Sequence, residues 1–315
     1  MEFILENDDM RVVIDSHGAT IKEIIFDGDN MICRPPYAAS VIGRIAGRIS
    51  HGKFTLDGVE YNLPKNENDN QLHGGHEFDR QADWDGSQFG DTIALKYHSP
   101  DGSNGFPGDL DVGVLYSLSK DNELRINYVA TSNKNTILNM TNHAYFNLNG
   151  ESSGEDVSNH ILEADVSKYV PLNSDLTPTG ELIEVSDVFD LREGRCIKDA
   201  VESSNSQCVL AKSGFDHAFV FNDCKDFNLY TNDVVHSAFL SCPDKRRVVT
   251  MKTDYPCFVC YTGNQMKEGP HMGVCLEAQL LPDAINKNGF GSIVLEAGKM
   301  YNHFVSYKFG FLRGE

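Results

Sequence analysis

The most chemically suggestive stretch of the chain runs from Val274 to Leu281. Its residues alternate between an apolar side and a side that carries Cys275, Glu277 and Gln279. A carboxylate in an otherwise apolar strand lies either on a solvated sheet face or in a pocket. In a pocket, Glu277 could act as a base or as a nucleophile.

A second stretch, Thr141 to Gly150, contains a histidine that could exchange protons at neutral pH. If this stretch is a strand, His143 and Tyr145 share one face, while Ala144 and Phe146 share the other. A face with histidine and tyrosine suits a wet cleft. The alternative is a core histidine whose ring nitrogens are satisfied by local partners.

Three further clusters place polar side chains beside glycines or within apolar runs. They are Gly43 to Ile49 (GRIAGRI), Leu72 to Gly75 (LHGG) and Gly214 to Phe219 (GFDHAF). Such clusters can present hydrogen-bonding groups to an uncharged polyol. Structural roles are also open, because either arginine could pair with a carboxylate at a sheet edge. His73 could cap a turn, and Asp216 could accept bonds from backbone amides.

The sequence lacks the complete motifs of zinc and nucleotide sites. Cys257 and Cys260 have CxxC spacing, but residues three apart in a strand face opposite sides, and no second pair completes a zinc site. Walker and GxGxxG motifs do not occur, and the one string with GxSxG spacing, GESSG at 150–154, lies in a polar segment that looks like a loop. His271 and His303 have no obvious partners. We therefore expect neither a metal nor an organic cofactor.

Period-two patterning predicts the elements that must position these residues. Between Phe54 and Leu63, apolar and polar residues alternate on either side of Asp57-Gly58, the dipeptide best suited to a type I′ hairpin turn. The same alternation occurs in Met10 to Ile14, Thr92 to Tyr97, Val112 to Leu118, Leu124 to Val129, Val248 to Met251 and Phe304 to Phe309. Asp27-Gly28 and Asp101-Gly102 are further turn signals. Helical stripes longer than two turns are absent, so the sequence predicts an antiparallel all-β fold.

Length and charge limit the classes of partner. The 315 residues hold 46 acidic and 27 basic side chains, a formal charge of −19, which repels nucleic acid and anionic membrane surfaces. No low-complexity linker divides the chain, so we expect one domain over residues 1–315. The acidic N-terminal residues do not resemble an export signal, and no apolar run approaches the ~20 residues that span a bilayer. The eight cysteines are then expected to be free thiols in a cytoplasmic protein.

Several of these segments together resemble one family. GRIAGRI, LHGG, GFPGDL, NHAYFNL, FDHAF, YTGN and CLEAQLLPDAIN occur in the order of the signatures of aldose 1-epimerases, also called galactose mutarotases. The resemblance covers nearly the whole chain. It implies a single large antiparallel β-sandwich whose cleft binds a hexose, such as galactose or glucose, and interconverts its α and β anomers.

The resemblance also implies roles for individual residues. Glu277 matches the base that takes the anomeric proton, and His143 the acid that protonates the ring oxygen. His73 matches a residue that bonds near the ring oxygen. The residues that match those holding the sugar hydroxyls are Arg48, Asp216 and Gln279. The family needs no cofactor, and the expected partner is the hexose alone, bound by a monomer or a homodimer.

One residue departs from the family pattern, and two other functions compete with the epimerase. Gly47 stands where an asparagine commonly precedes the substrate-binding arginine, which affects the choice of sugar. A sugar-binding protein without activity is one alternative, although it would not need both His143 and Glu277. A glycoside hydrolase that uses Glu277 with Asp216 is the other.

Overall fold

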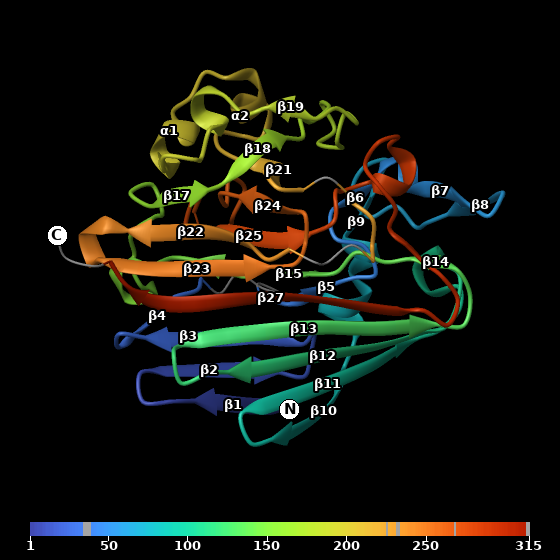
Figure 1. Cartoon of the computed structure of the whole chain (residues 1–315), viewed down its shortest axis with the longest axis horizontal. Coiled ribbons are helices and arrows are strands. Elements are labelled where there is room, and N and C mark those ends of the chain that lie inside the picture. The colour runs from blue at the N-terminus through green and yellow to red at the C-terminus, as the bar shows by residue number, and fades with distance from the viewer. Residues whose placement is uncertain (34–38, 225, 231–233, 268, 313–315) are drawn as a thin grey trace.

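A nine-stranded antiparallel sheet crosses the molecule (Figure 1). The computed structural model describes residues 1–33, 39–224, 226–230, 234–267 and 269–312. In sheet order, the nine strands are β10 (Asp85–Phe89), β11 (Thr92–Ser99), β12 (Leu110–Leu118), β13 (Glu123–Ser132), β27 (Met300–Phe311), β23 (Arg247–Thr253), β22 (His236–Cys242), β17 (Ile161–Ala164) and β20 (Arg195–Cys196). The longest strands lie near its centre. The runs predicted at Thr92 to Tyr97, Val112 to Leu118, Leu124 to Val129, Val248 to Met251 and Phe304 to Phe309 each fall within one strand of this sheet.

A six-stranded sheet packs against this first sheet. Its strands, in order, are β16 (Tyr145–Phe146), β25 (Val274–Gln279), β24 (Cys257–Tyr261), β21 (Asp216–Phe221), β18 (Val166–Tyr169) and β19 (Ile183–Glu184). The Tyr307 hydroxyl on β27 donates to the Leu276 carbonyl on β25 at 3.0 Å, and the Phe146 and Tyr307 rings lie 4.8 Å apart. These contacts join the two layers, so the predicted antiparallel β-sandwich is confirmed.

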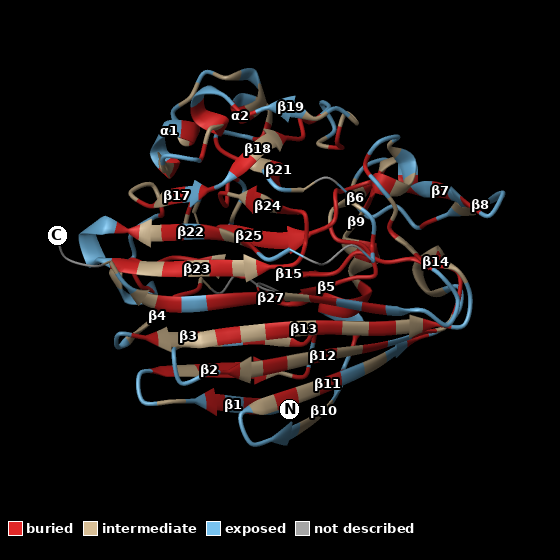
Figure 2. Ribbon diagram, viewed as in Figure 1, coloured by how far each residue is buried: buried red, intermediate tan, exposed pale blue. Residues whose placement is uncertain are grey.

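A four-stranded sheet continues the second layer. It consists of β1 (Glu2–Glu6), β2 (Met10–Asp15), β3 (Thr20–Phe26) and β4 (Asp29–Asn30). Phe26 on β3 packs against Phe309 on β27, with ring centroids 5.8 Å apart. Figure 2 shows buried residues recurring along the facing strands of both layers, as the period-two patterning requires.

Short hairpins, bridges and turns complete the described chain. The hairpin predicted at Asp57-Gly58 is confirmed, because both residues have positive φ, 51° and 78°, as a type I′ turn needs. Its strands are β7 (Lys53–Leu56) and β8 (Val59–Asn62), and the other short pairs are β5 (Val41–Ile42) with β15 (Thr141–Asn142), β6 (Arg48–Ile49) with β9 (Gln71–Leu72), and β14 (Thr136–Ile137) with β26 (Val294–Leu295). The α-helices are α1 (Ile197–Val201) and α2 (Ser206–Leu210). No described helix has the length and apolar character needed to cross a membrane.

The prediction of one alternating strand from Thr141 to Gly150 is wrong. The chain forms two short strands, β15 and β16, because it changes partners between them: β15 pairs with β5, and β16 pairs with β25. His143 lies at this change. Its carbonyl accepts from the Ala39 amide at 2.9 Å, so the backbone at His143 is held although it belongs to no strand.

Three other residues have partners that the sequence did not indicate. Arg44 is fully buried and donates to the backbone carbonyls of Ser99, at 3.0 Å, and Pro107, at 3.0 Å, instead of pairing with a carboxylate at a sheet edge. His271 bonds to the Thr262 carbonyl at 2.9 Å, and His303 to the Leu229 carbonyl at 2.8 Å. The expectation that these two histidines lack partners is therefore wrong.

Candidate active site

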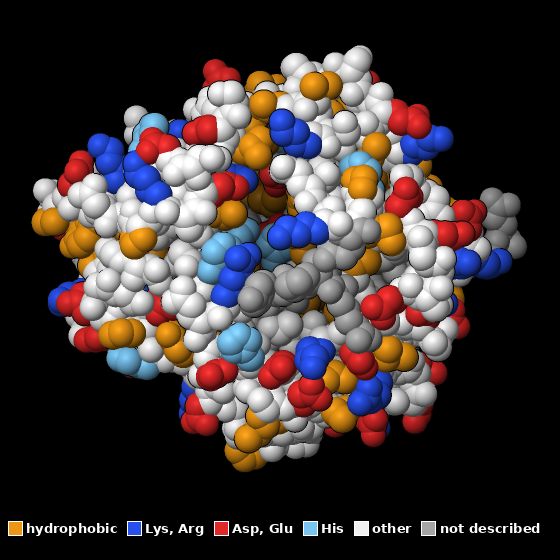
Figure 3. All heavy atoms as spheres, turned by 180° about the vertical axis from the view of Figure 1, so that it is seen from behind, with side chains coloured by type: hydrophobic (Ala, Val, Ile, Leu, Met, Phe, Trp, Pro, Cys, Tyr) orange, Lys and Arg blue, Asp and Glu red, His pale blue; other side chains and the backbone are white. Residues whose placement is uncertain are grey.

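A pocket opens beside the six-stranded sheet on the face turned away in Figure 1. Figure 3 shows this face, with a hollow near its middle and histidine and basic side chains gathered around the hollow. The cavity measures about 280 Å³, close to the lower end of the roughly 300–1,000 Å³ usual for small-molecule sites. All six residues predicted for the site line it: Arg48, His73, His143, Asp216, Glu277 and Gln279.

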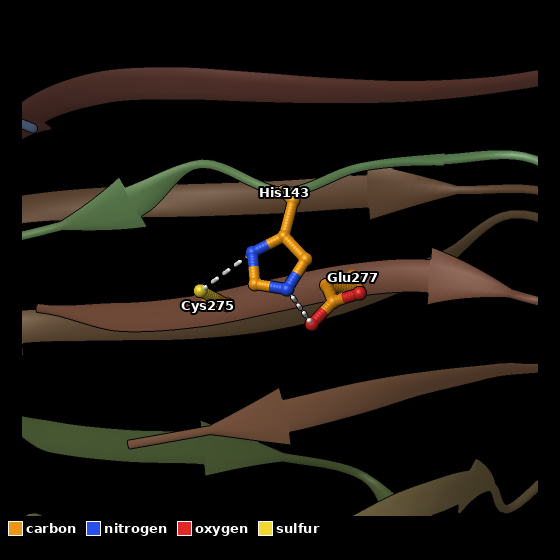
Figure 4. Close-up of side chains that lie close together, drawn as sticks. All are labelled: His143, Cys275 and Glu277. Carbon is orange, nitrogen blue, oxygen red and sulfur yellow. Dashed lines mark hydrogen bonds and ion pairs between the residues drawn. The ribbon is translucent and has the colours of Figure 1, made fainter. Parts of the chain in front are cut away.

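Glu277 and His143 face each other in this pocket. Glu277 lies on β25, which is buried throughout, so a solvated sheet face is the wrong interpretation of this carboxylate. Its Oε1 is 3.4 Å from Nε2 of His143 (Figure 4). The two side chains come from segments far apart in sequence, and the pairing of β16 with β25 brings them together.

Burial shifts the proton affinities of this pair in opposite directions. Removal from water raises the pKa of Glu277 well above its ordinary value, and the nearby Asp216 carboxylate adds to this effect while Arg48 opposes it. Burial lowers the pKa of His143 to about 4. Burial therefore disfavours the charged form of each group, so the empty site favours a neutral carboxyl on Glu277 beside a neutral imidazole on His143.

His73 lies beside His143, with ring centroids 5.3 Å apart. Its Nδ1 accepts a hydrogen bond from the Gly47 amide at 3.2 Å. Because a backbone amide only donates, the neutral ring carries its hydrogen on Nε2. Burial lowers the pKa of His73 well below its ordinary value, and the neighbouring His143 adds to this. His73 is thus a neutral hydrogen-bond donor.

Arg48 lies between two carboxylates. Its guanidinium binds Glu67 through two bonds, of 2.5 Å and 2.8 Å, and Nη1 is 3.8 Å from Oδ2 of Asp216. Burial works against the charge, but Asp216 and Glu67 raise the pKa of Arg48 overall. Burial raises the pKa of Asp216, against the effect of Arg48. The arrangement offers both donors and acceptors to sugar hydroxyls.

Gly47 and Gln279 border the same part of the cavity. Gly47 has a φ of +76°, which glycine adopts freely and asparagine tolerates. A Cβ at this position would lie 4.0 Å from Nε2 of Gln279. Among the described residues, Oε1 of Gln279 has no hydrogen-bond partner although it is buried, so it is a candidate acceptor for a ligand hydroxyl.

Aromatic rings form one wall of the pocket. Tyr145 stacks on His143 with centroids 4.9 Å apart, and Tyr261 meets Tyr145 edge to face at 6.1 Å. Aromatic walls suit the C–H faces of a sugar ring and also restrict the imidazole. The sequence placed Tyr145 on the same face as His143, and the stacking confirms this.

Two short turns form the rim of the pocket. They are η2 (His73–His76) and the π-helical turn η3 (Glu77–Gln81), and His76, Asp79 and Arg80 line the cavity. Behind them is Trp84, the single tryptophan of the chain. Its indole donates to the Phe78 carbonyl at 3.2 Å, and its ring meets the Phe78 ring at 5.5 Å. Phe78 also meets Tyr97 at 5.7 Å, so the rim is packed against the core through a small aromatic cluster.

Within the described part of the chain, one cluster has the donor types of a metal site: His143, Cys275 and Glu277. Its geometry does not suit one ion. The thiol lies 3.4 Å from Nδ1 of His143, whereas Glu277 lies 3.4 Å from Nε2. Figure 4 shows the ring between the two groups. A single ion would have to receive one nitrogen, so the ring would have to turn.

Sequence reasoning missed several residues that line or support the pocket. Glu67 comes from a polar segment that reads as an ordinary loop, and nothing in its sequence indicates the bond to Arg48. Tyr261 and His76 were likewise missed. Cys275 could have been found, because the alternation from Val274 places it on the same side as Glu277.

Comparisons with known proteins identify the family of this chain. The family model for aldose 1-epimerase matches residues 1–308. The chain belongs to the aldose 1-epimerase family. The galactose mutarotase of Bos taurus is 34% identical over 334 residues, covering 98% of this chain and 93% of that protein. The aldose 1-epimerase of Haemophilus influenzae is 32% identical over 306 residues, covering 92% and 86%.

A solved structure of the same family supports the fold. The galactose 1-epimerase of Lactobacillus acidophilus superposes with a TM-score of 0.86 at 31% sequence identity, covering 99% of this chain and 95% of that chain. This aldose 1-epimerase is therefore an isomerase that interconverts the α and β anomers of an aldose.

Proposed function

We propose that the enzyme opens and recloses the pyranose ring of a hexose, such as galactose or glucose, with Glu277 as base and His143 as acid. The observation that carries this assignment is the 3.4 Å distance between Oε1 of Glu277 and Nε2 of His143 in the buried pocket. The anomeric hydroxyl and the ring oxygen share one carbon, C1. An acid and a base that serve both oxygens must therefore lie close together.

The proton transfers balance within the pair. Ionised Glu277 takes the proton of the anomeric hydroxyl, whose oxygen forms a double bond to C1. The bond from C1 to the ring oxygen breaks, and that oxygen receives the proton of the His143 imidazolium. Rotation about C1–C2 and reversal of both transfers give the other anomer. After ring opening the proton is on Glu277 and His143 is neutral, which are the forms that burial favours.

The remaining site residues hold the sugar. Neutral His73 donates from Nε2 to the ring oxygen, where it stabilises the charge that develops. Arg48, Asp216 and Gln279 bind hydroxyls, and the absence of a side chain at Gly47 leaves space beside Gln279. The pocket volume of about 280 Å³ suits one monosaccharide.

Neither alternative gains support from a particular contact. A sugar binder has no use for a facing carboxylate and imidazole. In a two-carboxylate hydrolase, Asp216 would serve as acid or nucleophile. Its carboxylate instead lies 3.8 Å from the Arg48 guanidinium, an ion pair that suits binding of sugar hydroxyls.

Polarimetry of freshly dissolved α-D-glucose and α-D-galactose tests the proposal. The enzyme should speed the approach to the final rotation without changing that rotation, and EDTA should leave the rate unchanged. The sugar with the higher kcat/KM identifies the preferred hexose. Rates equal to those in buffer on a panel of aldoses would contradict the proposal.

We also propose that the chain works as one domain in the cytoplasm. No pair of cysteines forms a disulfide among the described residues, and five of the eight are buried, as suits a reducing compartment. Fractionation of the source cells would test the location. Sedimentation would distinguish a monomer from a homodimer.

A further inference from the structure

We propose that Cys275 is a positioning residue for His143: its sulfur accepts the Nδ1 hydrogen and thereby keeps Nε2 as the nitrogen that exchanges protons in the pocket. This inference rests on the proposed role of His143. Cys275 precedes Leu276 on β25, two residues before Glu277, and both side chains lie on the same side of the strand. One strand thus supplies both groups that face the imidazole.

The contact has the geometry of a hydrogen bond to sulfur. Sγ of Cys275 is 3.4 Å from Nδ1 of His143, and Figure 4 shows it on the side of the ring opposite Glu277. Cys275 is fully buried. Burial raises the pKa of its thiol well above the ordinary value, and the nearby Glu277 carboxylate adds to this. The partner of Nδ1 is therefore a neutral thiol.

The two ring nitrogens of His143 face groups of different chemistry. Nε2 faces a carboxyl group that holds or releases a proton, whereas Nδ1 faces the sulfur. In the proposed reaction Nε2 must lose and regain a proton, so the hydrogen that stays on the ring must be on Nδ1. Isolated neutral histidine prefers its hydrogen on Nε2. Something in the site must reverse this small preference, and even a weak N–H···S bond suffices.

His73 provides an internal comparison. Its Nδ1 accepts from the Gly47 amide, which fixes its hydrogen on Nε2. The two neighbouring histidines would thus carry their hydrogens on different nitrogens. The Gly47 amide faces His73, so this ring would always donate from Nε2. The Cys275 thiol faces His143, so Nε2 of that ring would be able to release and accept a proton.

Selective ¹⁵N-histidine labelling and long-range proton–nitrogen correlation can measure these tautomers directly at pH 7. The His143 signals are assigned from their loss in His143→Asn. The test compares the whole protein with Cys275→Ala, Cys275→Ser and a matched control, Cys260→Ala. Cys260 is an equally buried thiol on the adjacent strand β24, paired with Leu276.

In the unmodified protein we expect the His143 hydrogen on Nδ1, and in Cys275→Ala a substantial shift to Nε2. Cys275→Ala should lower kcat by about 5- to 10-fold with KM changed by less than about twofold. Cys275→Ser, whose hydroxyl oxygen also accepts, should recover most of the turnover. Cys260→Ala should change neither the tautomer nor kcat.

The result that overturns the proposal is a hydrogen on Nε2 of His143 in the unmodified protein, or an unchanged tautomer and kcat in Cys275→Ala. Equal losses in Cys275→Ala and Cys260→Ala would indicate packing alone. The tautomer measurement does not depend on turnover. Absence of mutarotase activity would refute the proposed function. The spectrum would still show whether Cys275 holds the hydrogen of His143 on Nδ1.

Discussion

The carboxyl group of Glu277 and the imidazole of His143 face each other in the pocket, 3.4 Å apart. In solution, an ionised carboxylate and a protonated imidazole would be the stable pair below pH 6.5. Burial disfavours both charges, so the neutral pair is favoured in the empty pocket. A bound sugar supplies new hydrogen-bond partners for the charged forms, and the reaction can then begin from them.

Substitution of either member of the pair tests the assigned roles. Glu277→Gln and His143→Asn should each lower kcat by on the order of 10²–10⁴, the usual effect of one positioned acid or base. KM should change far less, because both substitutions keep approximate shape and polarity. Polarimetric progress curves give both constants, and the exposed Glu163→Gln on β17 is the control. A near-normal kcat in folded Glu277→Gln would refute the mechanism.

The pH dependence of kcat/KM should reflect the buried pair. Below about pH 4 the imidazole of His143 becomes protonated while the carboxyl group of Glu277 also holds its proton. Neither group can then act as a base. We therefore expect kcat/KM to stay nearly constant from pH 7 down to pH 5. If His143 kept its ordinary pKa and had to be neutral in the free enzyme, kcat/KM would instead fall below about pH 6.5. Circular dichroism at each pH establishes that the protein is folded.

Asp216 separates sugar binding from hydrolysis. Asp216 has the proposed role of holding the substrate equally in the ground state and the transition state, so Asp216→Asn should raise KM more than it lowers kcat. The exposed Asp244→Asn is a suitable control. A hydrolase would respond differently: it would lose kcat in Asp216→Asn and would release sugar from a nitrophenyl glycoside, which this enzyme should not do.

At the scale of residues, the motifs predicted which side chains meet but not how they are held. All six predicted residues line the pocket. Glu67, Gly47 and Cys275, which bind Arg48, His73 and His143, were not assigned these contacts. Such contacts depend on backbone paths and ring orientations, which residue types and spacing do not specify.

At the scale of elements, the segment around β6 joins the core to the pocket. Arg44 donates to three backbone carbonyls, those of Ser99, Pro100 and Pro107. Burial lowers its pKa to about 10, so it is still charged at neutral pH. The same segment continues to Gly47 and Arg48, which line the cavity. The buried guanidinium thus fixes the backbone from which two pocket residues extend.

Removal of this guanidinium should destabilise the whole fold. Arg44→Met leaves the three carbonyls without their donor, at about 1 kcal/mol or more each, so the free energy of unfolding should fall by about 3 kcal/mol or more. Arg44→Lys keeps the charge with fewer directed donors and should lie between. Urea unfolding followed by circular dichroism measures both. A loss below about 1 kcal/mol in Arg44→Met would contradict this role.

Element prediction succeeded where a single sheet face decides the pattern and failed where the chain changes partners. The runs now seen in β12, β13 and β27 alternate because one side of each packs on the second layer. Between Thr141 and Gly150 the pattern also alternates, yet the chain leaves β5 and joins β25. A switch of partner leaves the alternation intact, so the sequence pattern does not reveal it.

At the scale of the whole molecule, buried neutral histidines make the fold sensitive to acid. Burial lowers the pKa of His143 and of His160 to about 4, and of His217 to about 3, and that of His73 well below its ordinary value. In the unfolded chain these groups take up protons near pH 6.5. The unfolded state therefore binds more protons between pH 6.5 and about 4, and stability falls as the pH falls through this range.

Calorimetry should show this dependence as a lower Tm at pH 5 than at pH 7, by about 5 °C or more. Glu277, Asp216 and Asp283, whose pKa values are raised by burial, oppose the trend and offset part of it. His217→Gln should reduce the slope of Tm with pH, whereas His51→Gln, an exposed position, should not. A Tm that is constant or higher at pH 5 would contradict this account.

The lone tryptophan behind the pocket rim gives the molecule its own optical reporter. Trp84 is bonded to Phe78, which shares η3 with Asp79 and Arg80 of the cavity lining. All indole fluorescence therefore originates at Trp84, which packs on Phe78 beside the turn whose residues line the pocket. Occupancy of the pocket can be titrated by emission without any label, even in variants that no longer turn the sugar over. Sugar binding can then be measured by Trp84 emission and turnover by polarimetry on the same sample.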